Sequence, residues 1–173
     1  MQGEHVRLRP LRREDSALLY QWIVDRELLI LNAPYLPVSQ PDHEAWIESM
    51  LVKRTDIVLF VVGDLATDHA IGTCQLFNIN WVHRNAELQI RIGDNGSQSR
   101  GLGSEAIKLL VNFGFKDLNL HRIYLHVFAT NERAIRAYEK CGFVREGVLR
   151  EAAHINGEFV DVLCMGRLRS EHA

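Results

Sequence analysis

The stretch that decides the fold is residues 86–104, which read AELQIRIGDNGSQSRGLGS. In its first part every second residue from Leu88 to Ile92 is apolar, and the residues between are polar. Such alternation places the apolar side chains on one face of a β-strand. A glycine-containing loop follows at 93–103, and from Ser104 to about Lys116 apolar residues recur at helical spacing. The stretch therefore predicts a strand, a loop and a long helix in succession.

Similar patterns continue on both sides of this stretch. Upstream we expect a strand, two helices and two paired strands, and downstream a short strand, a helix and a final hairpin. The expected strands are 6–11, 57–62, 70–77, 86–92, 123–127 and two around the turn Asn156-Gly157. The expected helices begin near 17, 42, 104 and 132, the last one capped by Asn131 and stopping at Gly142. No linker or repeat divides the chain, so residues 1–173 are predicted to form one domain with a mixed α/β sheet covered by helices.

The second of these helices follows a proline-containing segment at 32–41. Asp42 is expected to cap it. Its buried face is expected to consist of Ala45, Trp46 and Met50, with Ile47 as a further candidate.

Composition excludes several classes of protein. The 173 residues carry a net charge of -2, which gives no reason to expect a nucleic acid or an anionic membrane as partner. No run of about 20 apolar residues and no basic segment followed by an apolar one predicts a membrane span or a signal peptide. The three cysteines, an odd number without close spacing, indicate a reducing cytoplasm rather than a disulfide framework. The eight histidines are scattered, so no metal site is expected.

The loop before the long helix has the features of an anion site. Glycines let backbone N–H groups approach an anion, and a helix N-terminus adds aligned donors and positive charge. Arg100 adds a side chain that can pair with phosphate. Taken by itself, an isolated Gly-x-Gly favours the alternative, a structural turn and C-cap with an exposed arginine. Neither a P-loop nor a full dinucleotide fingerprint is present.

The pattern Gln98-x-x-Gly101-x-Gly103 matches the Gln/Arg-x-x-Gly-x-Gly/Ala signature of the GNAT superfamily of N-acetyltransferases. Residues 86–93 resemble the fourth strand of that family, and residues 118–143 resemble its fifth strand and the helix that follows. Within the superfamily the chain is similar to the ribosomal-protein N-terminal acetyltransferases and the spermidine acetyltransferases. The resemblance implies a mostly antiparallel sheet with helices on both faces and with fourth and fifth strands that splay apart. It also implies acetyl-CoA as the acetyl donor, without a metal.

The resemblance also implies where coenzyme A binds. In the family the loop grips the pyrophosphate, and the backbone of the fourth strand binds pantetheine. An asparagine at the start of the later helix contacts the pantetheine or phosphate arm, although here it is also a plain helix cap. The corresponding residues of this chain are Gln98, Ser99, Arg100, Gly101, Leu102, Gly103 and Ser104 for the loop, Gln89, Ile90 and Arg91 for the strand, and Asn131 for the cap.

Two side chains are implied to be catalytic. Glu87 corresponds to a carboxylate that removes a proton from the incoming amine, which an ammonium group requires before it can attack a thioester. The alternative is a strand carboxylate paired with Arg84 or Arg91. Tyr138 corresponds to a tyrosine that protonates the departing thiolate, and the alternative is a core aromatic residue. Cys141 is not expected to form a covalent intermediate.

The implied function is an N-acetyltransferase that works by direct attack of a primary amine. The alternative is a non-catalytic acyl-CoA-binding sensor on the same fold. The acceptor stays open among a peptide N-terminus, a polyamine, an amino sugar and an antibiotic amine. Spermidine enzymes carry an acidic cluster where this chain has the apolar run 28–35, a departure that weighs against a polyamine. A homodimer is common among similar proteins.

Overall fold

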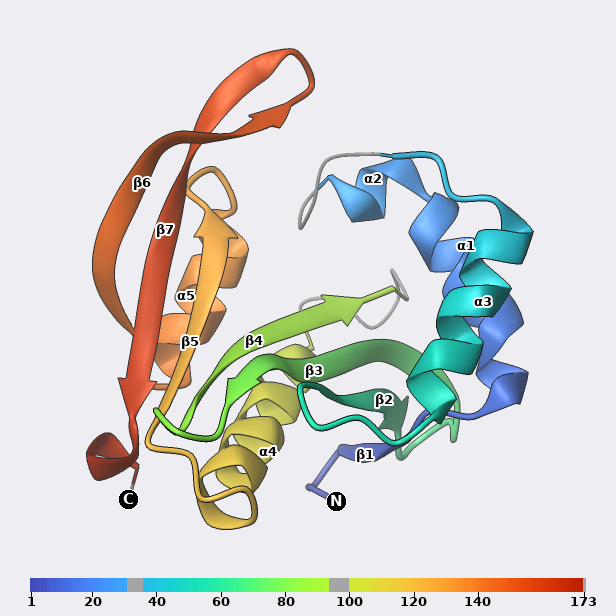
Figure 1. Cartoon of the computed structure of the whole chain (residues 1–173), viewed down its shortest axis with the longest axis horizontal. Helices are drawn as coiled ribbons and strands as arrows, with labels where there is room; N and C mark the ends of the chain where they lie inside the picture. The colour runs from blue at the N-terminus through green and yellow to red at the C-terminus, as the bar shows by residue number, and fades with distance from the viewer. Residues whose placement is uncertain (31–35, 94–99, 173) are drawn as a thin grey trace.

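The computed structural model describes residues 1–30, 36–93 and 100–172 (Figure 1). One sheet contains all the named strands, in the order β1-β2-β3-β4-β5-β7-β6. All neighbouring pairs are antiparallel except β4 and β5, which are parallel. The strands are β1 (Val6–Pro10), β2 (Val58–Asp64), β3 (Ala70–Asn80), β4 (Asn85–Ile92), β5 (Arg122–Phe128), β6 (Val144–Ile155) and β7 (Glu158–Leu168). The helices are α1 (Ser16–Val24), α2 (Arg26–Leu29), α3 (Gln40–Leu51), α4 (Leu102–Lys116) and α5 (Glu132–Lys140), with short 3-10 turns η1 (Arg13–Asp15) and η3 (Arg169–Glu171).

Helices cover both faces of the sheet, as predicted (Figure 1). On one face α4 packs against the main core cluster, to which Val62 and Leu88 contribute. On the other face α1 and α3 enclose a second cluster that includes Trp22, Ile47 and Val61. Val61 and Val62 are neighbours on β2, so their side chains point to opposite faces of the sheet. Both are fully buried, which shows that both faces are covered at this point. The apolar run in β2 therefore identifies a strand covered on both sides.

Strands β4 and β5 separate partway along their length. They are paired only where Asn85–Glu87 faces Arg122–Tyr124, whereas β4 stays paired with β3 as far as Ile92. Backbone groups of β4 beyond Glu87 that face β5 therefore have no sheet partner on that side. This confirms the predicted splay and opens the sheet in its middle.

The observed α3 differs from the prediction at its start and on its buried face. It begins at Gln40, and its cap is Ser39, whose hydroxyl accepts a hydrogen bond from the Asp42 backbone N–H at 3.2 Å. The buried side chains are His43 and Ile47, one helical turn apart, whereas Ala45 and Trp46 are exposed. A polar histidine is buried here because its Nε2 is 3.0 Å from the Ser16 carbonyl oxygen, to which it donates.

Helix α4 starts at Leu102, two residues before the predicted start. Its cap is Gly101, with a φ of +80°. The turn Asn156-Gly157 joins β6 to β7 as predicted, and both residues have positive φ, of 52° and 89°. Two consecutive positive φ angles are what a tight hairpin turn requires.

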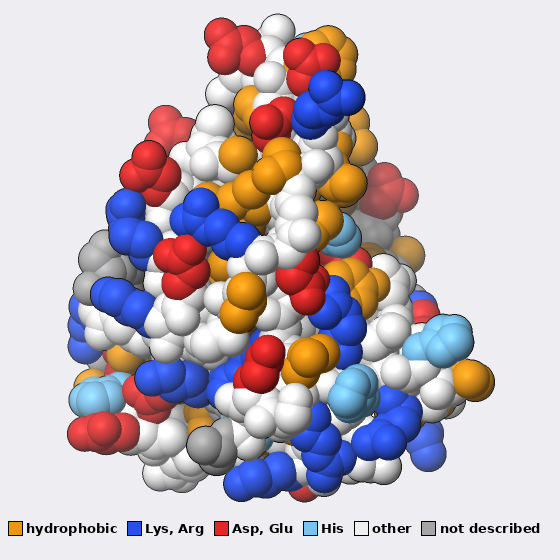
Figure 2. All heavy atoms as spheres, turned by 90° about the vertical axis from the view of Figure 1, so that its left-hand side faces the viewer, with side chains coloured by type: hydrophobic (Ala, Val, Ile, Leu, Met, Phe, Trp, Pro, Cys, Tyr) orange, Lys and Arg blue, Asp and Glu red, His pale blue; other side chains and the backbone are white. Residues whose placement is uncertain are grey.

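Strand β6 is an edge of the sheet. Figure 2 shows that side of the molecule, where hydrophobic side chains lie exposed among charged ones. The side chains of β6 are largely exposed, including the apolar residues Val144, Val148 and Leu149. Among the helices in the described ranges, none is both long enough and apolar enough to span a membrane. Within the same ranges no three His, Cys, Asp or Glu side chains are grouped so that they could hold a metal ion.

Candidate active site

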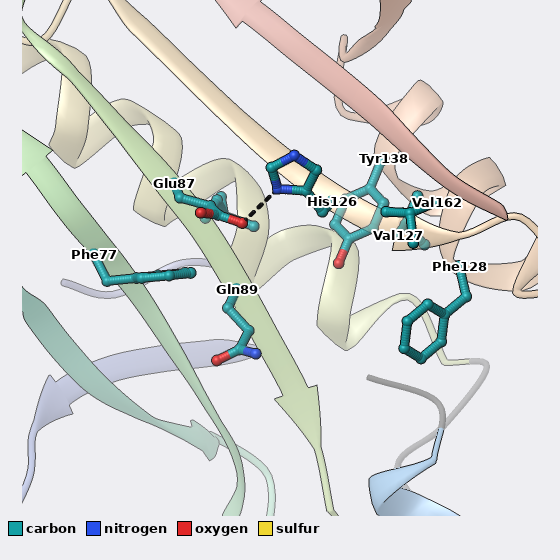
Figure 3. Close-up of a pocket in the computed structure, with 9 residues that line it drawn as sticks. Phe77, Glu87, Gln89, His126, Val127, Phe128, Tyr138 and Val162 are labelled. Carbon is teal, nitrogen blue, oxygen red and sulfur yellow. Dashed lines mark hydrogen bonds and ion pairs between the residues drawn. The ribbon is translucent and has the colours of Figure 1, made fainter. Parts of the chain in front are cut away.

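A cavity of about 130 Å³ lies where β4 and β5 separate (Figure 3). Polar groups from β4 and β5 line one part of it, and Tyr138 of α5 lines another. Phe77, Phe128 and Val162 supply much of its apolar wall. The two predicted catalytic residues, Glu87 and Tyr138, therefore lie on the wall of the same cavity, although they are 51 positions apart in the sequence.

The Glu87 carboxylate is held by two neighbouring side chains. Nδ1 of His126 lies 2.7 Å from Oε1, and the Asn78 side-chain amide donates to Oε2 at 3.2 Å. The Glu87 side chain is only 16% exposed. Its predicted alternative partners are not used: the Arg84 guanidinium instead binds the backbone and side-chain oxygens of Asn119.

His126 and Asn78 were not predicted from the sequence as site residues. The signal for His126 is long-range, because β4 and β5 pair in parallel with Glu87 opposite Tyr124. His126 lies two residues beyond Tyr124, on the same face of β5, and so comes next to Glu87. Without the register of β4 against β5, nothing in the sequence links the two residues.

Tyr138 is both a core residue and a cavity residue. Only 6% of it is exposed, and its ring packs against Phe143 with centroids 5.9 Å apart. Burial, together with the nearby Cys141, raises the pKa of the phenol to about 12. Figure 3 shows the phenol oxygen pointing into the cavity. The phenol is therefore protonated at any physiological pH and faces the space where β4 and β5 diverge.

The glycine loop is described from Arg100 onward, and the predicted residues Gln98 and Ser99 lie outside the described residues. Gly101 uses its positive φ, and a Cβ built there would meet no described atom within 4 Å. At Gly103 a Cβ would make an ordinary contact of 3.5 Å with Ile92. Among the described residues, a Cβ at the N-terminus of α4 would thus meet nothing at Gly101 and only the Ile92 side chain at Gly103. That arrangement fits a phosphate group approaching the first N–H groups of the helix.

Other side chains of this loop have structural partners. Arg100 is half-exposed and lies 3.2 Å from the buried carboxylate of Asp64, at the end of β2. Leu102 is buried in the main core. The Ser104 carbonyl accepts a hydrogen bond from the Cys141 thiol at 3.4 Å, and burial raises the pKa of that thiol. A buried, protonated thiol agrees with the prediction that Cys141 is not a nucleophile.

Asn131 caps α5, as one of its two predicted roles requires. Its side-chain oxygen accepts a hydrogen bond from the Ala134 backbone N–H at 3.2 Å. The cap fixes the start of the helix that carries Tyr138. A contact from Asn131 to coenzyme A remains a prediction.

The three predicted strand residues differ in where their side chains point. Ile90 packs against the main core on the α4 face. Gln89 accepts a hydrogen bond from the Gln75 amide at 2.7 Å and lines the cavity beside Glu87. Gln89 and Arg91 also line a second cavity, of about 240 Å³, under α1 and α3. The polar side chains of β4 thus follow one face of the strand from the first cavity into the second.

A family model described as acetyltransferase (GNAT) domain matches residues 5–144. The chain belongs to this family. Spermidine N(1)-acetyltransferase of Vibrio cholerae is 44% identical over 113 residues, which are 65% of this chain and 64% of that protein. The Escherichia coli K12 spermidine N(1)-acetyltransferase is 33% identical over 168 residues, which are 92% of this chain and 84% of the relative.

Solved structures agree with the sequence relatives. The crystal structure of spermidine N-acetyltransferase from Vibrio cholerae in complex with CoA and spermine has a TM-score of 0.91 against this chain. It is 34% identical and covers 98% of both chains. The family and these neighbours identify the chain as an N-acetyltransferase that uses acetyl-CoA to acetylate a small-molecule amine. They support the enzyme and not the non-catalytic acyl-CoA sensor.

Proposed function

We propose that the chain transfers the acetyl group of acetyl-CoA directly to a primary amine, with Glu87 as general base and Tyr138 as hydrogen donor to the departing sulfur. The observation that carries this proposal is that both side chains line the cavity at the splay of β4 and β5. Base and acid lie on different elements, β4 and α5, so they can serve different atoms of the reacting pair.

The first step needs a base because an ammonium group has no lone pair for attack. Glu87 accepts the proton, and the neutral nitrogen then attacks the thioester carbonyl carbon. Asn78 and His126 hold the carboxylate in place. In the tautomer that carries its hydrogen on Nε2, Nδ1 of His126 can accept the proton from Glu87 at 2.7 Å, and Nε2 can then release its own proton to solvent, since the side chain is 37% exposed.

The second step breaks the carbon–sulfur bond and leaves a negative charge on sulfur. Tyr138 donates its phenol hydrogen toward that sulfur as the charge develops. A phenol with a pKa of about 12 is a weaker acid than a thiol, whose usual pKa is about 8.5, so a strong hydrogen bond precedes any full transfer. The ammonium gives up two protons in all. The first passes through Glu87 to solvent before attack, and the second leaves the nitrogen after attack and balances the proton taken up by the thiolate, so the products are an N-acetyl amide, coenzyme A and one free proton.

The donor is expected to lie along β4, with its pyrophosphate at the N-terminus of α4. The open backbone at Gly101, the absence of a side chain at Gly103 and the edge of β4 that is unpaired with β5 beyond Glu87 support this placement. The backbone of Gln89, Ile90 and Arg91 then supplies hydrogen bonds to the pantetheine amides, and Ser104 and Leu102 contribute N–H groups of the first helical turn. The Arg100 guanidinium can bind the phosphates if its ion pair with the Asp64 carboxylate breaks.

A polyamine is the second candidate acceptor, because several relatives are named spermidine N-acetyltransferases. The described lining of the two cavities supplies one carboxylate, Glu87. A polyamine carries further positive charges that need partners of their own. A homodimer remains a separate expectation, and light scattering of the purified protein tests it.

The proposed function is tested by incubating the protein with acetyl-CoA and a panel of amines while free thiol is detected. The panel includes spermidine, amino sugars, aminoglycosides, amino acids and short peptides. Thiol release that depends on one class of amine, and falls strongly in Glu87→Gln and Tyr138→Phe, is the expected result. Full activity in both variants would contradict the assigned roles.

A further inference from the structure

The second cavity contains a cation that the catalytic scheme does not use. The cavity lies between the sheet and helices α1 and α3, and aromatic and aliphatic side chains form much of its wall. Its described lining contains Arg91 and the buried His43 as the ionisable groups, and it contains no carboxylate. The lining residues that matter here are Trp22, Trp46, Thr73, Gln89 and Arg91.

The Arg91 guanidinium lacks a partner within the described part of the chain. Its Nε is buried and makes no hydrogen bond, and no carboxylate of the described residues pairs with it. Burial lowers the pKa of Arg91 below its usual value, although a guanidinium stays charged at neutral pH. A second nitrogen without a partner, Nδ1 of His43, belongs to the same lining. The side chain is only partly exposed, and an enclosed charge without a counter-ion is costly, so an arginine in this position is expected to meet an anion that is absent from the chain itself.

We propose that Arg91 binds an anionic group of the acceptor, so that the preferred acceptor is a primary amine bearing a carboxylate at the far end of an apolar body. This inference rests on the proposed function, in which the amine lies beside Glu87. Glu87, Gln89 and Arg91 occupy alternate positions of β4 and share one face, and Gln89 lines both cavities. The two cavities are thus neighbours along one strand, with the Gln89 side chain lining both.

The spacing along β4 sets the length of such an acceptor. Arg91 is four positions beyond Glu87, which at about 3.3 Å per residue places their Cα atoms roughly 13 Å apart. An amine and a carboxylate on the order of 10 Å apart can therefore reach both side chains. The apolar wall, including Trp22 and Trp46, fits a hydrophobic body between the two charged ends.

The same geometry selects against a polyamine. A cationic second amine that entered this cavity would meet Arg91 and no described carboxylate. The cavity is also separate from the N-terminus of α4, because its lining comes from α1, α3 and strands β2 to β4 and the segment before β2. Arg91 is therefore assigned to the acceptor and not to the phosphates of coenzyme A.

The test compares three acceptors of equal length: ω-aminooctanoate, its amide, and the corresponding diamine. The variants are Arg91→Met, which keeps the bulk, and Arg91→Lys, which keeps the charge. Arg13→Met serves as the control, because Arg13 is an exposed residue paired with Glu48 outside both cavities. Wild-type protein is expected to favour ω-aminooctanoate in kcat/KM. Arg91→Met is expected to lose that preference by about 10- to 100-fold, the usual effect of removing a charge-assisted hydrogen bond.

Direct binding separates this inference from the proposed function. Calorimetric titration with ω-aminooctanoate needs no turnover, so binding that is lost in Arg91→Met supports the anion site even if no acetyl transfer occurs. Acetylation of the diamine as efficient as that of ω-aminooctanoate, and unchanged in Arg91→Met, would overturn the inference and leave the proposed function intact. A raised KM for acetyl-CoA in Arg91→Met, with acceptor preference unchanged, would overturn it in favour of a donor contact. Absence of both binding and turnover of ω-aminooctanoate would also overturn it.

Discussion

The Glu87 carboxylate and the His126 ring lie 2.7 Å apart, just where the pairing of β4 and β5 ends. Glu87 is the last residue of β4 that pairs with β5, where its partner is Tyr124. His126 is the second residue of β5 beyond Tyr124. The contact thus spans the opening of the splay, on one wall of the cavity that also contains Tyr138. Of the two side chains, His126 is the more exposed and Glu87 the more enclosed. This arrangement gives a base inside the cavity and an exit for its proton.

Replacing Glu87 with Gln tests the base. Gln keeps the shape and the contact with His126, but it cannot accept a proton. We expect kcat/KM of the variant to fall most at low pH, where nearly all acceptor amine is protonated. The deficit is expected to shrink as the pH approaches the amine's own pKa, because less proton removal is then needed. The measurement is a kcat/KM profile against pH for both proteins.

Glu139→Gln is the matched control for this prediction. It removes a carboxylate of α5 that binds Arg145 and does not line the catalytic cavity. Its profile should follow that of the wild type. A loss in Glu87→Gln that is equal at every pH would mean that Glu87 orients the substrate without taking its proton.

Tyr138→Phe tests the hydrogen donor. Phe preserves the ring that packs against Phe143, so the fold and the affinity for acetyl-CoA are expected to change little. The value of kcat is expected to fall by roughly 100-fold if the hydroxyl stabilises the departing sulfur. Because burial holds the phenol pKa at about 12, no loss of activity from its ionisation is expected below about pH 11. Steady-state kinetics at saturating acetyl-CoA measure the effect, and an unchanged kcat would leave Tyr138 as a core residue only.

The region from β4 through α4 could be predicted from the sequence because its signals are local. Alternation in β4 and helical spacing in α4 depend on which residues are neighbours along the chain. The hairpin turn at Asn156-Gly157 is local in the same sense, since its positive φ angles suit these residue types. The family resemblance implied that Glu87 and Tyr138 belong to one site, and in the structure both side chains line one cavity.

The parts that could not be predicted depend on distant neighbours. The buried face of α3 follows from His43, whose burial requires the Ser16 carbonyl of another helix. The contact of Glu87 with His126 follows from the register of β4 against β5. In the sequence 29 residues lie between the end of β4 at Ile92 and the start of β5 at Arg122. The surroundings of the Arg91 side chain depend on α1 and α3, which line the same cavity but are distant from Arg91 in the sequence. None of these relationships leaves a periodic trace in the sequence.

Binding of coenzyme A is expected to depend on Gly103. A ligand at 100 times its dissociation constant adds about 2.7 kcal/mol to the free energy of unfolding, so acetyl-CoA should raise the melting temperature of the wild type. In Gly103→Val the added side chain projects from the N-terminus of α4, where the phosphates are expected, and the shift should disappear. The Cβ itself has room at 3.5 Å from Ile92, so the unliganded variant should still fold.

Gly147→Ala is the control for this measurement. A Cβ at Gly147 would meet no described atom within 4 Å, and the residue belongs to β6, away from the loop. Its acetyl-CoA shift should equal that of the wild type. A full shift in Gly103→Val would show that the phosphates bind elsewhere.

The pair of Arg9 and Asp15 is expected to make stability depend on pH. Asp15 is 7% exposed, and its two oxygens accept hydrogen bonds from the Arg9 guanidinium at 2.6 and 2.8 Å. Burial acts to raise the pKa of this carboxyl, but the hydrogen bonds from Arg9 and from the Arg12 backbone N–H outweigh it, so the pKa is lowered. The pair joins β1 to the turn before α1, the helix that carries Trp22 into the second cavity.

The sign of the effect follows from this lowered pKa. The unfolded chain, with an Asp pKa of about 3.9, binds more protons than the folded protein in the acid range, so stability falls as the pH decreases through the folded pKa. The contribution of Asp15 is therefore fully present above about pH 5 and is lost in acid. Asp15→Asn should lower the free energy of unfolding by roughly 3 kcal/mol at neutral pH, because the Arg9 guanidinium then loses the negative charge that it faces. That corresponds to a melting temperature lower by about 6–12 °C. The difference should narrow as wild type and variant are both melted at decreasing pH.

Asp56→Asn is the control: its pair with Arg54 is exposed, and removing it should leave the melting temperature nearly unchanged. A deficit in Asp15→Asn that persists undiminished to pH values near 2 would show that the charge of Asp15 is not what stabilises this corner of the fold.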